Sequence, residues 1–304
     1  MAVGVAMTDL ALGPIHYHWS ADRKLDFYAR IADEAPIDTV YLGEVICSKR
    51  APFFEDQYQA VTERLERGGK TVIWSTLCEV MLKREREMIA QINEMPAQEF
   101  EVNDSSALFH ISGRPHRIGP FVNVYNEDTL TYLAGRGATH VCLPSEIPRS
   151  AVAVLCGKAR ELGVGVEVQA FGRISLAVSA RCYHARAHNR SKDNCLFVCE
   201  QDPDGMALQT LTGQDFLAIN GIQTLSHTYL NLLAELPDMA ALGIGHIRLN
   251  PQSLDMIAVA RTYRGVLDGA LGTDEGTERL RAICPGASMS NGFWHGRAGH
   301  TYAA

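Results

Sequence analysis

Short apolar segments of strand length alternate with amphipathic helical segments along most of this chain, and this alternation constrains the fold more than any other feature. The strand-like segments are rich in Val, Ile, Phe and Tyr. They lie at 3–8, 39–46, 71–77, 99–103, 120–125, 139–143, 164–171 and 244–250. Because eight parallel strands, each followed by a helix, close into a barrel, the pattern predicts an α/β fold of the (β/α)8, TIM-barrel-like type.

The segments between the strands carry helix signals. Leu25, Tyr28 and Ala32 share one helix face before Pro36. Asn126, followed by two acidic residues, is a typical helix start, and the helix predicted to open at Pro148 ends at Gly163.

The regular alternation stops between 172 and 226, where one connection becomes much longer than the others. We therefore expect one β/α-barrel-like domain over 1–304, with 172–226 as an elaborated, cysteine-bearing segment after the seventh strand. Division into two domains near 172 is the alternative.

Charge and hydropathy exclude several classes of protein. The formal net charge of −7 argues against a general nucleic-acid-binding or anionic-membrane surface. The longest uncharged run, Phe216 to Ala234, contains too many polar residues to span a membrane. The opening apolar segment lacks the basic start and cleavage site of a signal peptide, so we expect a cytoplasmic protein.

Three cysteines lie close together inside the long connection. The chain has no Walker loop, no GxGxxG after the first strand, no GxSxG and no HExxH. It does have Cys182, Cys195 and Cys199 in the spacing C-x12-C-x3-C. In a reducing compartment clustered thiols indicate a metal site first, since thiolates are ligands for zinc and for iron–sulfur centres.

A fourth ligand is needed, and Cys47 is the best-placed candidate. It follows the second strand, and in a parallel barrel all strand C-termini face the same rim as the long connection. Cys142 and Cys156 lie in an apolar strand and on an apolar helix face, where cysteine behaves as a core residue. The remaining candidates are Cys78, Cys284, His184 and His188.

The charge of the long connection favours an iron–sulfur centre over zinc. Between 173 and 192 there are five Lys or Arg residues and no Asp or Glu. Positive surroundings offset the negative charge of a thiolate-bound cluster. A solvated basic loop is the simpler explanation, and a zinc site that joins Cys182 to His184 and His188 is a further alternative.

Four charged residues at or near the strand ends are candidates to contact substrate or to support the site. They are Glu44, Glu167, Arg173 and Arg181. An ordinary buried ion pair is the alternative for each of them.

The stretch GVEVQAFGRISLAVSARCY, which ends at Tyr183, resembles the signature of the collagenase-like peptidase family. Glu167, Gly172, Arg181 and Cys182 match the family pattern, whereas Ser175 stands where the usual first cysteine is expected. GEVICSKR at 43–50, LPSE at 143–146 and NGFWHGRAG at 291–299 are similar to one branch of the family, which acts in oxygen-independent ubiquinone biosynthesis.

This resemblance implies a barrel that holds a [4Fe–4S] cluster on Cys47, Cys182, Cys195 and Cys199. It also implies a heterodimer with a larger homologue, UbiU, in a complex that hydroxylates the ring of quinone precursors without O2 and takes the oxygen from prephenate. Two alternatives remain within the family. One is peptidase activity, although no activated nucleophile is visible. The other is hydroxylation of RNA, which the basic run at 173–192 would bind.

Overall fold

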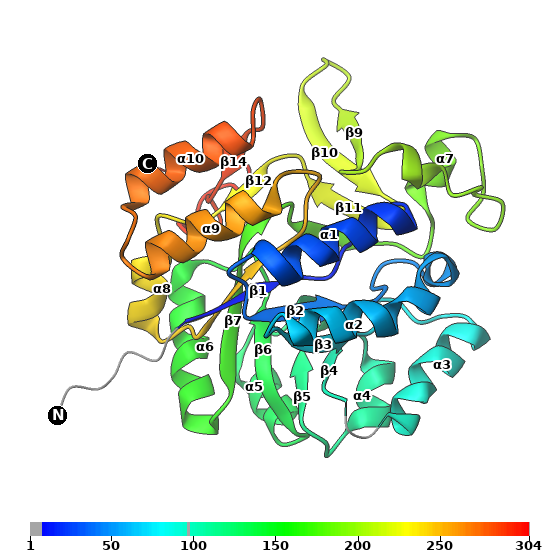
Figure 1. Ribbon diagram of the computed structural model, residues 1–304, viewed down its shortest axis with the longest axis horizontal. Coiled ribbons are helices and arrows are strands. Elements are labelled where there is room, and N and C mark those ends of the chain that lie inside the picture. The colour runs from blue at the N-terminus through cyan, green and yellow to red at the C-terminus, as the bar shows by residue number, and fades with distance from the viewer. Residues whose placement is uncertain (1–7, 96–97, 304) are drawn as a thin grey trace.

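A closed barrel of eight parallel strands forms the centre of the molecule in the computed structural model, which describes residues 8–95 and 98–303 (Figure 1). The strands are β1 (Asp9–Leu12), β2 (Thr39–Leu42), β3 (Thr71–Ser75), β4 (Phe100–Val102), β5 (His116–Ile118), β6 (Ala138–Leu143), β7 (Gly165–Gly172) and β13 (His246–Leu249). Each strand from β1 to β7 pairs with the next. Strand β13 closes the ring, with Ile247 opposite both Leu10 of β1 and Val168 of β7.

Helices surround the barrel (Figure 1). They are α1 (Ala21–Glu34), α2 (Tyr58–Arg67), α3 (Lys83–Ala90), α4 (Ser105–Ile111), α5 (Glu127–Ala134), α6 (Arg149–Leu162), α8 (Leu236–Leu242), α9 (Met256–Leu267) and α10 (Thr273–Ile283). The predicted helix signals are confirmed, since the Asn126 side chain accepts from the N–H of Thr129 at 2.9 Å and Gly163 ends α6 at a φ of +69°.

The predicted fold class is confirmed, but two strands differ from the expectation. The segment 120–125 is not a strand: it starts with a 3-10 turn, η4 (Pro120–Val122), and the fifth strand is β5, just before it. Pro120 has no N–H to donate to a sheet, so the strand ends ahead of it. The predicted strand at 3–8 lies almost entirely outside the described residues, and the first described strand is β1.

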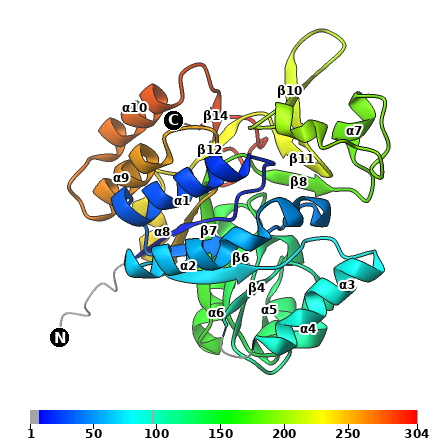
Figure 2. The same ribbon diagram turned by 45° about the vertical axis from the view of Figure 1, so that its right-hand side comes forward.

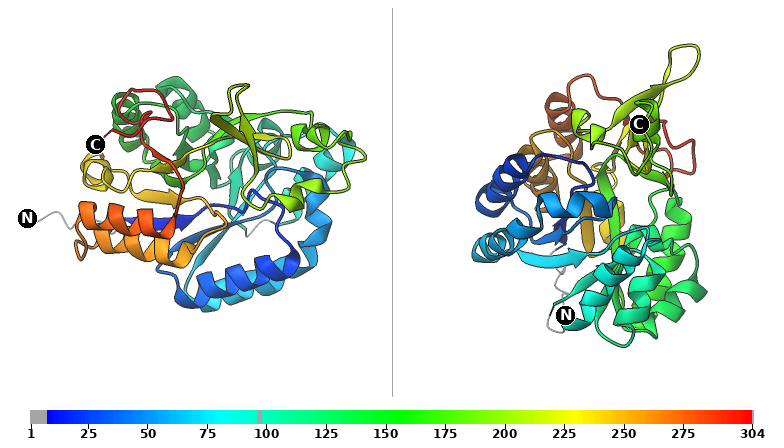
Figure 3. Two further views of the ribbon diagram at one scale, coloured as in Figure 1. Left: turned by 90° about the horizontal axis from the view of Figure 1, so that it is seen from above. Right: turned by 90° about the vertical axis from the view of Figure 1, so that its right-hand side faces the viewer.

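The connection between β7 and β13 builds a second, four-stranded antiparallel sheet in the order β8-β11-β10-β9. Its strands are β8 (Ser175–Val178), β9 (Met206–Gln209), β10 (Asp215–Asn220) and β11 (Gln223–Ser226). The short helix α7 (Tyr183–Ala187) and the 3-10 turn η5 (Val198–Gln201) lie between β8 and β9. Figures 2 and 3 show this sheet and α7 together on one side of the barrel, beyond the end of β7. Two short strands, β12 (Tyr229–Asn231) and β14 (Met289–Ser290), extend the main sheet past β7.

Three further 3-10 turns lie among the described residues. They are η1 (Ser48–Phe53), η2 (Glu55–Gln57) and η3 (Gln91–Glu94). None of the helices described here has the length and apolar character needed to cross a membrane.

The barrel interior is ionic as well as apolar. Arg248, which is 2% exposed, pairs with Glu101 at 2.5 Å and also with Glu167. The Tyr41 hydroxyl donates to Glu167 at 2.8 Å and accepts from Arg117 at 3.2 Å. Burial raises the pKa of Glu167, but Arg248 and Tyr41 outweigh burial, and the net pKa is lowered. The buried charges are therefore compensated inside the barrel.

Candidate metal centre

Cys47, Cys182, Cys195 and Cys199 line one small, largely apolar cavity. They come from three places: Cys47 precedes η1, Cys182 caps the N-terminus of α7, and the other two lie in the loop and 3-10 turn that follow α7. The structure thus brings together the four cysteines that the sequence singled out, from segments more than a hundred residues apart. All four are free thiols.

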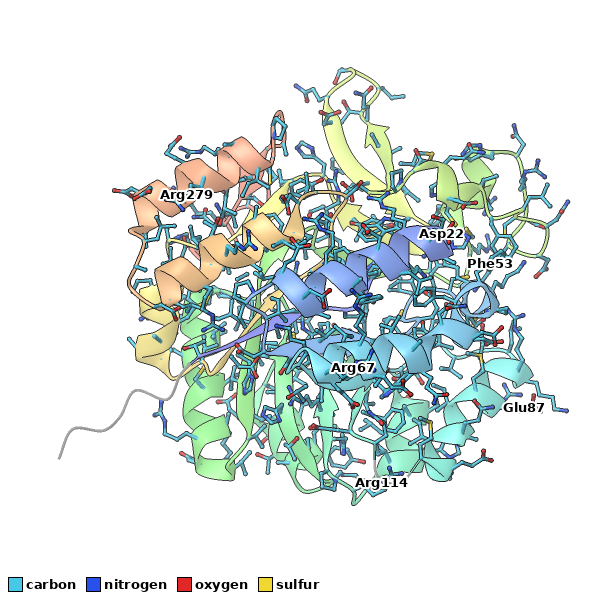
Figure 4. All side chains as sticks on the ribbon, in the orientation of Figure 1. Asp22, Phe53, Arg67, Glu87, Arg114 and Arg279 are labelled. Carbon is cyan, nitrogen blue, oxygen red and sulfur yellow. The ribbon has the colours of Figure 1, made fainter. Side chains whose placement is uncertain are left out.

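Contacts between residues at the cavity wall hold these segments together. The Lys49 ammonium donates to the carbonyl oxygens of Lys192 at 2.7 Å and Asp193 at 3.0 Å. The rings of Phe53 and Phe197 meet edge to face, with centroids 4.6 Å apart. Figure 4 labels Phe53 at this junction, beside the loop that follows α7. The turn after β2 is therefore anchored directly to the cysteine loop.

Glu44 shapes the turn that delivers Cys47. Its buried carboxylate accepts from the backbone N–H groups of Ile46 at 3.0 Å and Cys47 at 2.9 Å. Two such bonds fix the chain direction immediately after β2. Of the four charged candidates, Glu44 thus acts on the position of a cavity cysteine.

The other three charged candidates lie elsewhere. Glu167 belongs to the ionic network inside the barrel. Arg173 donates to the carbonyl oxygen of Ser226 at 2.9 Å and lies over the ring of Tyr229. Arg181 is exposed and lines a surface groove that adjoins Cys182. None of the three lines the four-cysteine cavity.

The cavity also contains a buried arginine that sequence reasoning missed. Arg50 is 2% exposed and donates to the carbonyl oxygen of His16 at 2.8 Å and to Oδ1 of Asn220 at 3.0 Å. Its buried Nε has no partner among the described residues. Burial lowers the pKa of Arg50, but Cys199, Glu44 and Cys47 outweigh burial, and the net pKa is raised. A permanent positive charge therefore faces the thiols.

Gly221 makes room for this guanidinium. It has a φ of +64°, and a Cβ at this position would lie 2.7 Å from Nη2 of Arg50. A side chain here would be both strained and crowded. The sequence hardly indicates a buried role for Arg50, because an arginine in a loop is normally exposed. The only sequence signal for it is its position three residues after Cys47.

Burial affects the protonation of two of the cavity thiols, Cys47 and Cys182. It raises the pKa of Cys47 and of Cys182, although Arg50 acts in the opposite direction on both. These two thiols therefore keep their protons near neutral pH in the absence of a metal, and metal binding would release them.

The remaining four cysteines lie away from the four-cysteine cavity. Cys142 and Cys156 are 2% and 4% exposed and belong to the core, as the sequence predicted. Cys284 is buried as well, and Cys78 lines a separate cavity. None of these four lines the cavity described above.

The two histidines of the alternative zinc site lie side by side on α7 and just after it. His184 lines the four-cysteine cavity, but its Nε2 hydrogen-bonds to Oδ2 of Asp202 at 2.9 Å and not to a thiol. The His188 ring stacks on the His184 ring with centroids 5.7 Å apart. Their carboxylate partner was not anticipated from the sequence.

A larger cavity of about 330 Å³ opens at the barrel rim, next to the cysteine cavity. Its lining includes His16, Phe121 and Asn250, which follow barrel strands, and Gln169, which lies within β7. The two cavities share a partition in which Val45, Ile46 and Ile222 form the buried core and Cys78, Phe121, Val178 and Cys182 pack against it. Burial lowers the pKa of His16 to about 3, so this side chain is neutral.

Comparison with known families identifies a match over most of the chain. The model of the family described as Peptidase family U32 matches residues 27–303, which include all four cavity cysteines and every barrel strand except β1.

Proposed function

The chain belongs to peptidase family U32, and from that premise we propose that it is an iron–sulfur protein whose [4Fe–4S] cluster is bound by Cys47, Cys182, Cys195 and Cys199. The observation that carries this proposal is the convergence of these four thiols on one buried cavity. When bound, such a cluster supplies one-electron redox chemistry.

The spacing of the thiols is wider than a single bound zinc ion would impose. Four thiolates around one zinc at 2.3 Å lie about 3.8 Å from one another by tetrahedral geometry. Among the described residues, no three of these sulfur atoms lie within 4.8 Å of one another. A cubic four-iron cluster is larger than one ion and separates its thiolates further.

The surrounding charges support the same assignment. Arg50 contributes a buried positive charge with an unpartnered Nε–H, and Lys49 and Lys192 line the same cavity. A cluster with four thiolates carries net negative charge, which these groups would offset. Arg50 would both balance the charge and donate a hydrogen bond toward the cluster.

At a finer level, we propose that the chain acts like UbiV, in a heterodimer with a UbiU homologue, in the oxygen-independent ring hydroxylation of ubiquinone precursors. The support is the resemblance at GEVICSKR, LPSE and NGFWHGRAG, together with Ser175 in place of a family cysteine. Ser175 lines the cavity at the barrel rim, so in this chain that position faces the larger cavity. The reaction replaces a ring C–H by C–OH, which is a two-electron oxidation, so it needs an acceptor for two electrons and the ring proton in addition to an oxygen donor such as prephenate.

Purification without oxygen tests the cluster. We expect brown protein with about four irons and four sulfides per chain, the content of one such cluster. Cys47→Ala, Cys182→Ala, Cys195→Ala and Cys199→Ala should lose iron, whereas Cys142→Ala is the matched control and should keep it. Colourless protein with one zinc would contradict the proposal. Quinone precursors that accumulate in an anaerobically grown deletion strain, and disappear on complementation, test the pathway.

Hydroxylation of RNA is the second candidate. Arg181, Arg186, Arg190 and Lys192 line one groove of about 350 Å³ beside Cys182. Such a groove could contact phosphates, and binding would then weaken steeply with salt. RNA retained by the wild type but not by an Arg186→Ala, Arg190→Ala double variant would favour this function over quinone hydroxylation.

Peptidase activity receives less support. Among the hydrogen bonds of the described residues, no serine hydroxyl or cysteine thiol pairs with a histidine. Such a pair is the usual means of activating a nucleophile. Peptide cleavage that is lost on changing one Ser or Cys outside the four ligands would reverse this conclusion.

A further inference from the structure

A second group of metal-ligating side chains lies directly behind the four-cysteine cavity. His184, His188 and Asp202 each offer one ligand atom, and these three atoms lie within 4.8 Å of one another. His184 also lines the cysteine cavity, whereas His188 and Asp202 do not. The group therefore stands apart from the four thiols but shares a wall with them.

The positions of the ligand atoms suit one small ion. Nε2 of His184 and Oδ2 of Asp202 are 2.9 Å apart. Two ligands at about 2.0–2.1 Å from a tetrahedral zinc are separated by about 3.3 Å, so a shift of a few tenths of an ångström would admit the ion. The two histidine rings are nearly parallel, at 9°, and an imidazole binds an ion in the plane of its ring, so the His188 ring would have to turn for both nitrogens to point at one ion.

The group is buried at His184 and open to solvent at Asp202. His184 is 0% exposed, yet its Nδ1 is buried without a partner among the described residues. Because Nδ1 lies on the other side of the imidazole from Nε2, an ion on Nε2 would leave Nδ1 unpaired, and a water molecule is the partner that this buried atom calls for. The Asp202 side chain is 31% exposed, so solvent can reach the group and supply further ligands.

The place of the group in the chain suggests its role. His184 and Asp202 lie at the two ends of the loop that carries Cys195 and Cys199, and Cys182 is two residues before His184. An ion held by both ends would close the base of this loop. It would fix three of the four cavity thiols relative to one another.

We propose that His184, His188 and Asp202 bind one divalent transition-metal ion that closes the base of the cysteine loop. Two imidazoles and one carboxylate select zinc, ferrous iron or cobalt over magnesium and calcium, which prefer oxygen ligands alone. The site is independent of whether the four cysteines bind a cluster.

Titration with Co²⁺ tests the site on the full-length chain purified without oxygen, with its iron retained. We expect about one Co²⁺ per chain with weak visible bands and without the intense near-ultraviolet bands of cobalt–thiolate bonds. His188→Phe keeps a ring to stack on His184 but removes the ligand nitrogen, and Asp202→Asn keeps an acceptor for His184 but removes the charge. Both should weaken binding more than tenfold, whereas His300→Phe, an exposed histidine elsewhere, should not change it.

Limited proteolysis tests the role of the ion. Zn²⁺ should slow tryptic cleavage after Arg186 and Arg190 in the wild type and have no effect in His188→Phe. Absence of Co²⁺ binding, or equal binding by His188→Phe and the wild type, would overturn the proposal. Unchanged cleavage rates would overturn the loop-closing role. Iron and sulfide are measured in the same samples, so failure of the four-cysteine centre is recognised separately.

Discussion

The ammonium of Lys49 donates a 2.7 Å hydrogen bond to the carbonyl oxygen of Lys192, and this bond joins the turn that carries Cys47 to the loop that carries Cys195. The two residues are 143 positions apart in the chain. Cys47 is therefore held near the other three cysteines by a specific contact between two distant segments, and not by its position in the chain.

Replacing Lys49 should loosen this junction. Lys49→Met keeps much of the side-chain volume but loses two hydrogen bonds to carbonyl oxygens, which together are worth about 1–3 kcal/mol. We expect faster loss of iron from the anaerobically purified protein, followed by the decay of its visible absorbance. Lys83→Met is the control, because Lys83 is highly exposed and pairs with the exposed Glu87. Equal decay rates in the two variants would show that the junction does not hold the site.

Arg50 should set the reduction potential of the proposed cluster. A buried positive charge favours the more negative, reduced state, so its removal lowers the potential. At a separation of roughly 6 Å and an effective dielectric constant of about 20, the effect is on the order of 100 mV. Arg50→Lys keeps the charge and should shift the potential less than Arg50→Met in a spectroscopic redox titration.

Folding must be checked in the same experiment. Arg50→Met leaves the carbonyl of His16 and the amide of Asn220 without their guanidinium partner. The far-ultraviolet circular dichroism spectrum and iron content of both Arg50 variants therefore accompany the titration. A folded, iron-loaded Arg50→Met protein with the wild-type potential would contradict the predicted role.

Sequence patterns predicted the barrel well because buried parallel strands are apolar along their whole length. The exception is β5, whose three residues His116, Arg117 and Ile118 include two polar side chains. The Arg117 guanidinium lies in the ionic network of the barrel, where it donates hydrogen bonds to Glu99 and to the Tyr41 hydroxyl. A strand that contributes to a buried ionic cluster loses the apolar pattern by which strands are recognised.

The site was predictable only where topology constrains it. The shared rim of parallel strands places Cys47 near the cysteine loop, and this follows from the fold class alone. Arg50 and Asp202 could not be found in this way. Their roles depend on contacts with Asn220 and His184, which come from an antiparallel sheet and a short helix that carry no clear periodic signal.

Gly221 should be intolerant of any side chain. Gly221→Ala places a methyl group 2.7 Å from Nη2 of Arg50 and also strains a backbone with φ of +64°. Gly213→Ala is a matched control, since Gly213 has a φ of +78° but nothing within 4 Å of the added carbon. Backbone strain alone costs about 1–2 kcal/mol in each variant.

Urea unfolding of both glycine variants separates strain from crowding. We expect Gly221→Ala to lose more stability than Gly213→Ala and also to lose iron, because Arg50 is displaced from the cavity. Gly213→Ala should retain wild-type iron content. Equal losses of stability in the two variants would mean that the Arg50 side chain can move away from the added methyl group without a cost in free energy.

The ionic network of the barrel should make the protein sensitive to acid. The pKa of Glu167 is lowered in the folded state, since Arg248 and Tyr41 outweigh the opposing effect of burial. A carboxylate with a depressed folded pKa contributes stability above its unfolded pKa of about 4.3, and this contribution is lost as the pH falls toward the folded value. Urea midpoints measured from pH 7 down to pH 3 should therefore fall steeply below about pH 4.3 in the wild type.

Glu167→Gln isolates the part of this acid sensitivity that belongs to the network. Glutamine cannot ionise, so the variant should be less stable at pH 7 by roughly 3 kcal/mol, because Arg248 loses one of its two carboxylates. The difference in stability between Glu167→Gln and the wild type should then become smaller as the pH falls. Glu278→Gln removes an exposed carboxylate paired with Arg281 and should change stability little at any pH. A constant difference between Glu167→Gln and the wild type across the whole range would show that Glu167 acts through packing and not through its charge.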